Sequence, residues 1–252
     1  LAVQGGAGTN AFARIDTASV TEQLIGCASY FGGCIDAIGT LNIGSLLAAT
    51  GSGAYSRITG VGAQRVTANT AINLTGSVTD AAATLTGAGQ DIRFGSSGIM
   101  TLTAGAGNNA NALVQSSTTQ NIDRSSLTLV GGGAAGATAT AQITATGNQT
   151  IDQNLARPVI LSGGMGDNAL ARIASGANQT LRHNGVTMTG GAGIGSLVEI
   201  AATGTQSLTG SGVMTLKGGG LAPGGAVGNA WATSEGNGRA ISAGAIWLFG
   251  GA

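Results

Sequence analysis

Few residues of this 252-residue chain could carry acid–base or metal chemistry, because it has only 10 Asp and Glu residues together and one His. Asp123 and Asp152 each lie three positions after a Gln, and Arg93 and Arg182 hold the same place before and after them. If these positions stack, the two carboxylates could hold Ca²⁺ or exchange a proton. The simpler interpretation, which we favour, is two ion pairs, Arg93 with Asp123 and Asp152 with Arg182. We therefore predict no enzyme, no cofactor and no assigned metal site, and leave calcium binding by the aspartates open.

The single histidine, His183, follows Arg182 and has no acid or nucleophile near it in the sequence. We expect it to be an exposed loop residue and not a catalyst. The glycine string 131–133 lacks the lysine and the helix of a phosphate-binding loop, and it predicts a sharp corner.

The two cysteines, Cys27 and Cys34, are seven residues apart within the longest interval of a repeat described below. The extra residues of that interval predict a loop insertion at about 26–39, and two nearby cysteines in such a loop indicate a local disulfide in an oxidising compartment. Two free buried thiols are the alternative. A metal site is disfavoured because the loop offers one carboxylate, Asp36, and His183 is distant.

Glutamine recurs at one position of a short Gln-x-apolar pattern. The recurrent residues are Gln64, Gln90, Gln120, Gln149, Gln179 and Gln206. Stacked amides can bond from one strand to the next, which satisfies every buried amide except those at the ends. We predict such an amide ladder; a surface row of Gln that binds a ligand is the alternative.

These residues are positioned by a triplet of strands that recurs about every 29 residues. The first strand has its last apolar residue at Val3, Ile43, Leu74, Leu102, Leu129, Leu161, Met188, Leu216 and Leu248. The second strand ends at Ile15, Ile58, Leu85, Val114, Ile143, Ile173, Ile200 and, less regularly, Ser234. The third strand opens at Gln23, Gln64, Gln90, Gln120, Gln149, Gln179, Gln206 and, less regularly, Arg239. Three anchors that keep one period predict a solenoid.

Each predicted strand alternates apolar and other residues, so one face of each can point inward. The 47 glycines allow sharp corners between strands. We therefore predict one domain over residues 1–252, an all-β, right-handed, three-sided parallel β-helix of eight coils plus one strand. Its core should include Ala112, Val114, Leu129, Ile143, Leu161, Ala171, Ile173, Met188 and Ile200.

Charge is sparse, at 8% of residues, and the formal net charge is zero, so no nucleic acid or anionic membrane partner is expected. No apolar run approaches the roughly 18 residues of a membrane span. The chain begins within a predicted strand, from which we expect a mature or trimmed product, or a segment of a longer protein.

Large apolar residues at outward or end positions indicate contact surfaces. The predicted first outward column of the second strand is Phe12, Tyr55, Ala82, Asn111, Thr140, Leu170, Leu197 and Trp231. Both chain ends are copies of the first strand, so their edges can pair with another chain. The predicted self-association residues are Leu1, Val3, Trp231, Ile246, Trp247, Leu248 and Phe249. Cover of the outward residues by loops of the same chain is the alternative.

Repeats such as Leu-Thr-Leu-Val-Gly-Gly at 127–132 and Val-Thr-Met-Thr-Gly-Gly at 186–191 carry a resemblance over the whole chain. The chain resembles the β-strand-repeat passengers of bacterial surface and secreted proteins, including filamentous-haemagglutinin-like exoproteins and autotransporter passengers. The resemblance implies a right-handed β-helix that is exported to the cell surface as an adhesin, fibre or matrix component.

The first functional hypothesis is an extracellular, bacterial structural protein whose subunits stack head to tail, so that its partner is itself. The alternative is an adhesin stalk or passenger segment that binds a surface or host glycan or protein. A polysaccharide-active enzyme is disfavoured because carboxylates are few. An ice-binding face would need regular Thr-x-Thr rows, of which Thr101/Thr103 and Thr187/Thr189 are examples.

Overall fold

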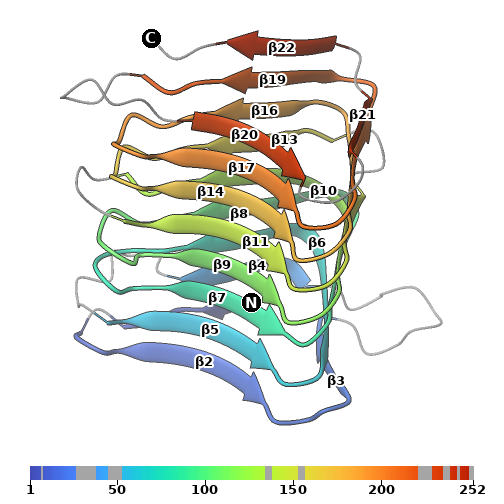
Figure 1. Cartoon of the computed structure of the whole chain (residues 1–252). Helices are drawn as coiled ribbons and strands as arrows, with labels where there is room; N and C mark the ends of the chain where they lie inside the picture. The colour runs from blue at the N-terminus through green and yellow to red at the C-terminus, as the bar shows by residue number, and fades with distance from the viewer. Residues whose placement is uncertain are drawn as a thin grey trace.

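The computed structural model of the chain describes residues 1–6, 8–26, 38–44, 53–133, 138–152, 157–220, 229–234, 239–242 and 245–249. Within these ranges the regular elements are strands, and the strands pair in parallel. No helix among the described residues could cross a membrane. The chain winds as a parallel β-solenoid with a repeat of about 29 residues (Figure 1).

One sheet of eight strands holds the second strand of each triplet, here called the second column. In stacking order it consists of β2 (Phe12–Thr17), β5 (Tyr55–Gly60), β7 (Ala83–Gly87), β9 (Ala112–Ser116), β11 (Thr140–Ala145), β14 (Leu170–Ser175), β17 (Leu197–Ala202) and β20 (Asn229–Ser234).

The other sheet has 14 strands and contains the first and third columns. The first column runs through β1 (Ala2–Val3), β4 (Ile38–Gly44), β6 (Ala63–Thr75), β8 (Gln90–Thr103), β10 (Gln120–Val130), β13 (Val159–Ser162), β16 (Val186–Thr189), β19 (Val213–Lys217) and β22 (Ala245–Phe249). The third column runs through β3 (Glu22–Ile25), β6, β8, β10, β12 (Gln149–Asp152), β15 (Gln179–His183), β18 (Gln206–Gly210) and β21 (Arg239–Ser242).

Three long strands belong to both columns, which the sequence pattern did not predict. β6, β8 and β10 run without a break from the third position of one coil into the first position of the next, with a register shift midway. In the later coils the same path is divided into separate strands, such as β12 and β13. The shift marks the place where the strand bends around the corner.

The predicted period is confirmed. The chain forms about six turns of about 29 residues, where eight coils were expected. Every predicted anchor of the first strand, and every Gln anchor with Arg239, pairs with the next one in register. The handedness and the number of sides stay predictions.

The core lies inside the coils, where alternate residues of all three columns meet. The nine residues predicted to be buried are all inaccessible to solvent. This confirms the period-two alternation, in which each inward apolar side chain stacks on its counterparts one coil away.

One anchor of the second strand is wrong. The structure pairs Ile200 with Ala232 and Glu199 with Trp231, so Ser234 is not the equivalent of Ile200. Trp231 therefore pairs with Glu199 and not with Leu197, which places it two residues further along the strand than predicted. Asn229 takes its place in the first outward column. The error arose because β20 lacks a large apolar residue to mark its inward side.

In the described turns before the second-column strands, the left-handed position is held by Asn or Asp four times and by Gly twice, at Gly53 and Gly195. Asn10, Asp80, Asn109 and Asn168 have φ between 53° and 57°, and Gly195 has φ 68° at the equivalent turn. Asn and Asp tolerate this left-handed conformation better than other residues with a side chain. Asn and Asp therefore serve at these corners as well as glycine.

The predicted disulfide between Cys27 and Cys34 falls outside the described residues, as does most of the predicted insertion at 26–39. Both stay predictions.

Candidate functional site

The predicted amide ladder is present and is longer by one member than the predicted set. Each Gln Nε2 donates to the Oε1 of the Gln in the preceding coil, from Gln206 back to Gln23. The six nitrogen–oxygen distances lie between 2.7 and 3.0 Å. All seven side chains are at least 92% buried, so the ladder is an internal structure and not a ligand-binding row.

The ladder has a direction and two different ends. Gln23 Nε2 has no further amide to reach and lies 3.5 Å from the carbonyl of Thr59. Gln206 Oε1 is buried and accepts no hydrogen bond from the described residues. The next residue in its column is Arg239 instead of a Gln. Interior members are therefore satisfied on both sides and the last member on one side only.

The two ends of the solenoid expose strand edges. Among the described strands, β1, β2 and β3 have a partner on one side only, and so do β20, β21 and β22 at the other end. Such edges present unpaired backbone donors and acceptors that can pair with another chain.

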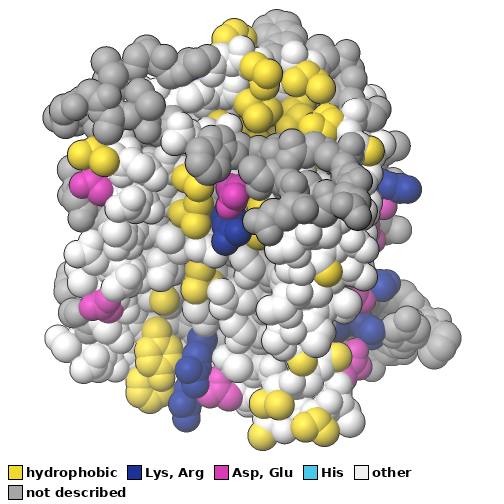
Figure 2. All heavy atoms as spheres, viewed as in Figure 1, with side chains coloured by type: hydrophobic (Ala, Val, Ile, Leu, Met, Phe, Trp, Pro, Cys, Tyr) yellow, Lys and Arg dark blue, Asp and Glu magenta, His cyan; other side chains and the backbone are white. Residues whose placement is uncertain are grey.

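Large apolar side chains accompany these edges. Leu1 is 52% exposed, Ile246 51%, Leu248 73% and Phe249 49%, whereas Val3 is covered by its own chain. Hydrophobic side chains gather at the end of the stack that carries β22 (Figure 2). Trp231 and Trp247 belong to described strands, but their side chains are not among the described parts of the chain. Ile246 and Leu248 continue the inward column, as the register partners of Met214 and Leu216.

The predicted charged column stacks in register. Asp123 is the register partner of Arg93 in the coil before it and of Asp152 in the coil after it, and Arg182 pairs with Asp152 at 3.5 Å. Arg93 contacts Asp91 at 2.9 Å, a pairing that the sequence analysis missed. No group of three or more His, Cys, Asp or Glu residues is close enough to hold a metal ion in the described part of the chain.

Asp91, a carboxylate on the surface of the third column, is surrounded by hydrogen-bond donors and positive charges. Burial alone would raise its pKa, but hydrogen bonds from Arg93 and Asn121 and the charges of Arg93 and Arg65 outweigh burial, so the pKa of Asp91 lies below its usual value. Arg65 also reaches Glu22 at 3.3 Å. These residues line a groove of about 530 Å³ over the third column. The described charges of this groove are paired with one another.

His183 lies inside the solenoid, so the expectation of an exposed loop residue was wrong. Its side chain is completely buried at the end of β15. Nδ1 accepts a hydrogen bond from the Gly185 amide at 3.1 Å, and Nε2 has no partner among the described residues. Its register partner is Gly210, where any Cβ would meet the imidazole within 2.5 Å. Burial lowers the pKa of His183, because the charged form would lose its hydration.

An aromatic and arginine cluster on the outer face of β2 and β5 was only partly anticipated. The rings of Phe12 and Tyr55 stack with centroids 5.2 Å apart and planes 7° apart. Arg14 lies over Phe12 and Arg57 over Tyr55, at 5.6 and 5.2 Å from the ring centroids. Asp16 pairs with both arginines at 3.2 Å. The signal for it was the alternation of aromatic, arginine and acid along β2.

Hydrophobic side chains lie beside Lys and Arg side chains at this edge of the second column (Figure 2). The cluster has two cations to one carboxylate, and its Phe12 ring is the more open of the two, since Phe12 is 57% exposed.

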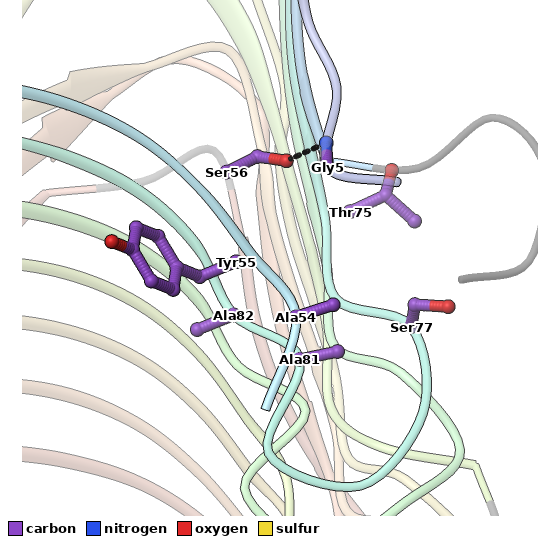
Figure 3. A pocket seen from close by; sticks show the side chains of 9 residues that line it. Gly5, Ala54, Tyr55, Ser56, Thr75, Ser77, Ala81 and Ala82 are labelled. Atoms are coloured by element: carbon purple, nitrogen blue, oxygen red, sulfur yellow. Dashed lines mark hydrogen bonds between the residues drawn. The ribbon is translucent and has the colours of Figure 1, made fainter. Parts of the chain in front are cut away.

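A small void next to this cluster is too small to bind an organic ligand. Gly5, Ala54, Tyr55, Ser56 and their neighbours enclose about 10 Å³, close to the lower limit for one water molecule (Figure 3). The Gly5 amide donates to Ser56 Oγ across it at 2.7 Å.

The threonine rows that an ice-binding face would need are interrupted. Thr101 and Thr128 are neighbours on the outer face of the first column, but the next residue is Ile160. Thr187 follows Ile160, so the row resumes one coil later.

Comparisons with known proteins bring no relative: no family model, curated protein or solved structure matches the chain. Function is therefore inferred from the geometry. The described part of the chain has paired surface charges, a buried amide ladder and two open ends. Of these, the open ends have unsatisfied interactions that another molecule could complete.

Proposed function

We propose that this chain is a structural β-solenoid subunit whose copies stack head to tail into an extracellular filament or matrix fibre. The observation that supports it is β22, a strand that has a partner on one side and carries two inward-facing apolar residues, Ile246 and Leu248, with no described coil over them. β1, β2 and β3 offer the complementary open edges at the other end.

The energetic reason for stacking is the apolar surface and the unpaired backbone at each end. Full burial of one Leu side chain stabilises by about 1.5–3 kcal/mol, and Leu248 is 73% exposed. Added strands also give the edge amides and carbonyls partners. Since every strand is parallel, the two ends differ, and the contact joins unlike surfaces. Such a heterologous contact does not close, and it generates a filament.

Sedimentation velocity and electron microscopy of the 252-residue chain test the proposal. We expect concentration-dependent polymers that appear as thin rods, and we expect Leu248→Asp to remove them, because the joint would bury an unpaired carboxylate. Met165→Asp is the matched control: Met165 is 63% exposed but lies in a turn midway along the stack. It should leave the polymers unchanged. A monomer at all concentrations would contradict the proposal.

We also propose that the chain is exported and acts at the bacterial surface or outside the cell, as its resemblance to filamentous-haemagglutinin-like and autotransporter passengers implies. The low content of charged residues and the repeated Gly-rich turns support this resemblance. Fractionation of the source cells, followed by detection of the chain in the medium and surface fractions, tests it; retention in the cytoplasm would contradict it.

A second candidate function is an adhesin stalk or passenger segment that binds a glycan or protein. The cluster of Phe12, Tyr55, Arg14 and Arg57 favours it, since an open aromatic face beside cations can stack on a sugar ring and bond its hydroxyls. Binding to a panel of immobilised oligosaccharides should then be lost in Phe12→Ala. Equal binding by the chain and the variant would count against this role for the cluster.

A further inference from the structure

The three columns do not hold equal numbers of strands. The first column has nine, from β1 to β22, whereas the second has eight, from β2 to β20, and the third has eight, from β3 to β21. β22 is thus the extra strand: it is the first strand of a further coil whose second and third strands are not among those described. A second copy of the chain can supply them.

A joint that continues all three columns creates a conflict in the first one. If β2 of the next copy pairs with β20, and its β3 pairs with β21, then its β1 must occupy the place that β22 already holds. If β1 is instead added above β22, the other two columns are one strand short at the joint. That leaves a gap of one strand spacing, roughly 4.8 Å, beside Ile15, which is 38% exposed at the edge of β2.

We infer that the joint forms by strand exchange, in which β22 of one copy replaces β1 of the next and pairs with its β4. This inference rests on the proposed head-to-tail stacking and specifies its geometry. It makes a segment of this chain, Ala245–Phe249, the ligand of an edge on a second copy of this chain.

The register makes the two strands interchangeable. Leu248 and Val3 hold the same position of the first column, since they pair with Leu216 and Ile43, which are themselves equivalent. Ile246 then corresponds to Leu1, and both are apolar and half exposed. β22 therefore places apolar side chains at the two inward positions that Leu1 and Val3 hold.

β22 is also the stronger strand at that position. It spans five residues in register with β19, whereas β1 spans two in register with β4. A longer strand forms more ladder hydrogen bonds with β4, which spans seven residues. With β1 displaced, β2 and β3 continue directly from β20 and β21. Ala232, the register partner of Ile200, then lies over Ile15 and covers it.

Engineered cysteines distinguish exchange from simple stacking. In the exchanged joint, Trp247 of one copy lies beside Asn42 of the next, because Ala2 and Asn42 are register partners. Neighbouring strands are about 4.8 Å apart, within the Cα separation that a disulfide accepts. In simple stacking Trp247 lies beside Ala2 instead. Polymers of Trp247→Cys/Asn42→Cys and of Trp247→Cys/Ala2→Cys are oxidised and run on non-reducing gels.

We expect a ladder of covalent multimers from the Asn42 pair and only background from the Ala2 pair. The single variant Trp247→Cys reports the background from the native cysteines. A second pair, Ala245→Cys with Thr40→Cys, tests the same register without removing the tryptophan. With Trp247 beside Asn42, the parallel register places Ala245 beside Thr40, so this pair should also give multimers.

The possible outcomes separate this inference from the proposed function. Multimers from the Ala2 pair alone, or polymers in which neither exchange pair cross-links, would overturn strand exchange while stacking survives. Failure of the unmodified chain to polymerise would overturn the stacking itself, and the exchange with it. Covalent ladders from both exchange pairs would establish the joint.

Discussion

The amide ladder allows the most quantitative test of what holds the coils together. In Gln120→Leu, an apolar side chain of similar size replaces a central member. Gln149 Nε2 then loses its acceptor at 2.7 Å, and Gln90 Oε1 loses its donor at 2.7 Å. Both partners stay buried, since Gln90 is 4% and Gln149 1% exposed.

The cost follows from the two groups left behind. A buried polar group without a partner costs about 1–3 kcal/mol. Gln149 Nε2 keeps a long contact to the Ile143 carbonyl at 3.5 Å, so its penalty lies toward the lower limit. We therefore expect Gln120→Leu to lower the free energy of unfolding by about 2–5 kcal/mol.

The end of the ladder supplies a matched control. Gln206→Leu removes the donor at 2.8 Å from Gln179 Oε1 and the donor at 3.2 Å from the Ile200 carbonyl, but it also removes Gln206 Oε1, which has no partner among the described residues. The loss of that unsatisfied oxygen offsets part of the cost, so the expected penalty is about 0–2 kcal/mol. The two substitutions remove the same atoms and add the same apolar side chain.

Urea unfolding followed by circular dichroism measures both variants. Because solenoids can unfold in segments, the transitions are compared by midpoint and slope, and single coils are reported by amide hydrogen exchange. If Gln206→Leu costs as much as Gln120→Leu, side-chain packing and not amide pairing determines the loss, and the reasoning is refuted.

Two further predictions concern single groups inside and beside the stack. His183 is buried and its pKa is lowered, so the unfolded chain binds a proton near pH 6.5 when the folded chain does not. The free energy of unfolding should therefore fall as the pH drops below about 6.5. In urea unfolding at pH 5 to 8, His183→Asn should flatten that dependence. A pH-independent midpoint would contradict it. Cys27 and Cys34 should resist alkylation in the native protein until a reductant is added, and two reactive thiols would rule out the disulfide.

The sequence predicted the stacking register well, because the narrow interior imposes the same demand on every coil. A polar side chain at the position of Leu129 or Ile173 would be buried without a partner, so an apolar residue recurs there in each coil. The Gln column repeated for the same reason, since each buried amide requires another one coil away. A constraint that neighbouring coils share therefore appears in the sequence as a residue type that recurs once in each repeat.

Features that occur in a single coil were the ones that sequence reasoning missed. His183 has no counterpart at its position, and its burial depends on the space left by Gly210 in the next coil. Trp231 was placed one alternation too early, because its strand has alanines where the others have large apolar residues. The pairing of Arg93 with Asp91 lies within one strand, so the assumption that charges pair between coils did not find it.

The direction of the ladder bears on how copies of this chain can meet. Every amide donates toward the coil that contains Gln23 and accepts from the coil that contains Gln206, and every strand pairing has the same polarity. If two like ends met, the strands of one copy would run antiparallel to those of the other at the joint, so the parallel columns could not continue in register. Unlike ends preserve the spacing, the polarity and the inward alternation. In the proposed assembly, the features that stabilise the interior of one chain would therefore also favour a polar, open-ended stack over a closed dimer.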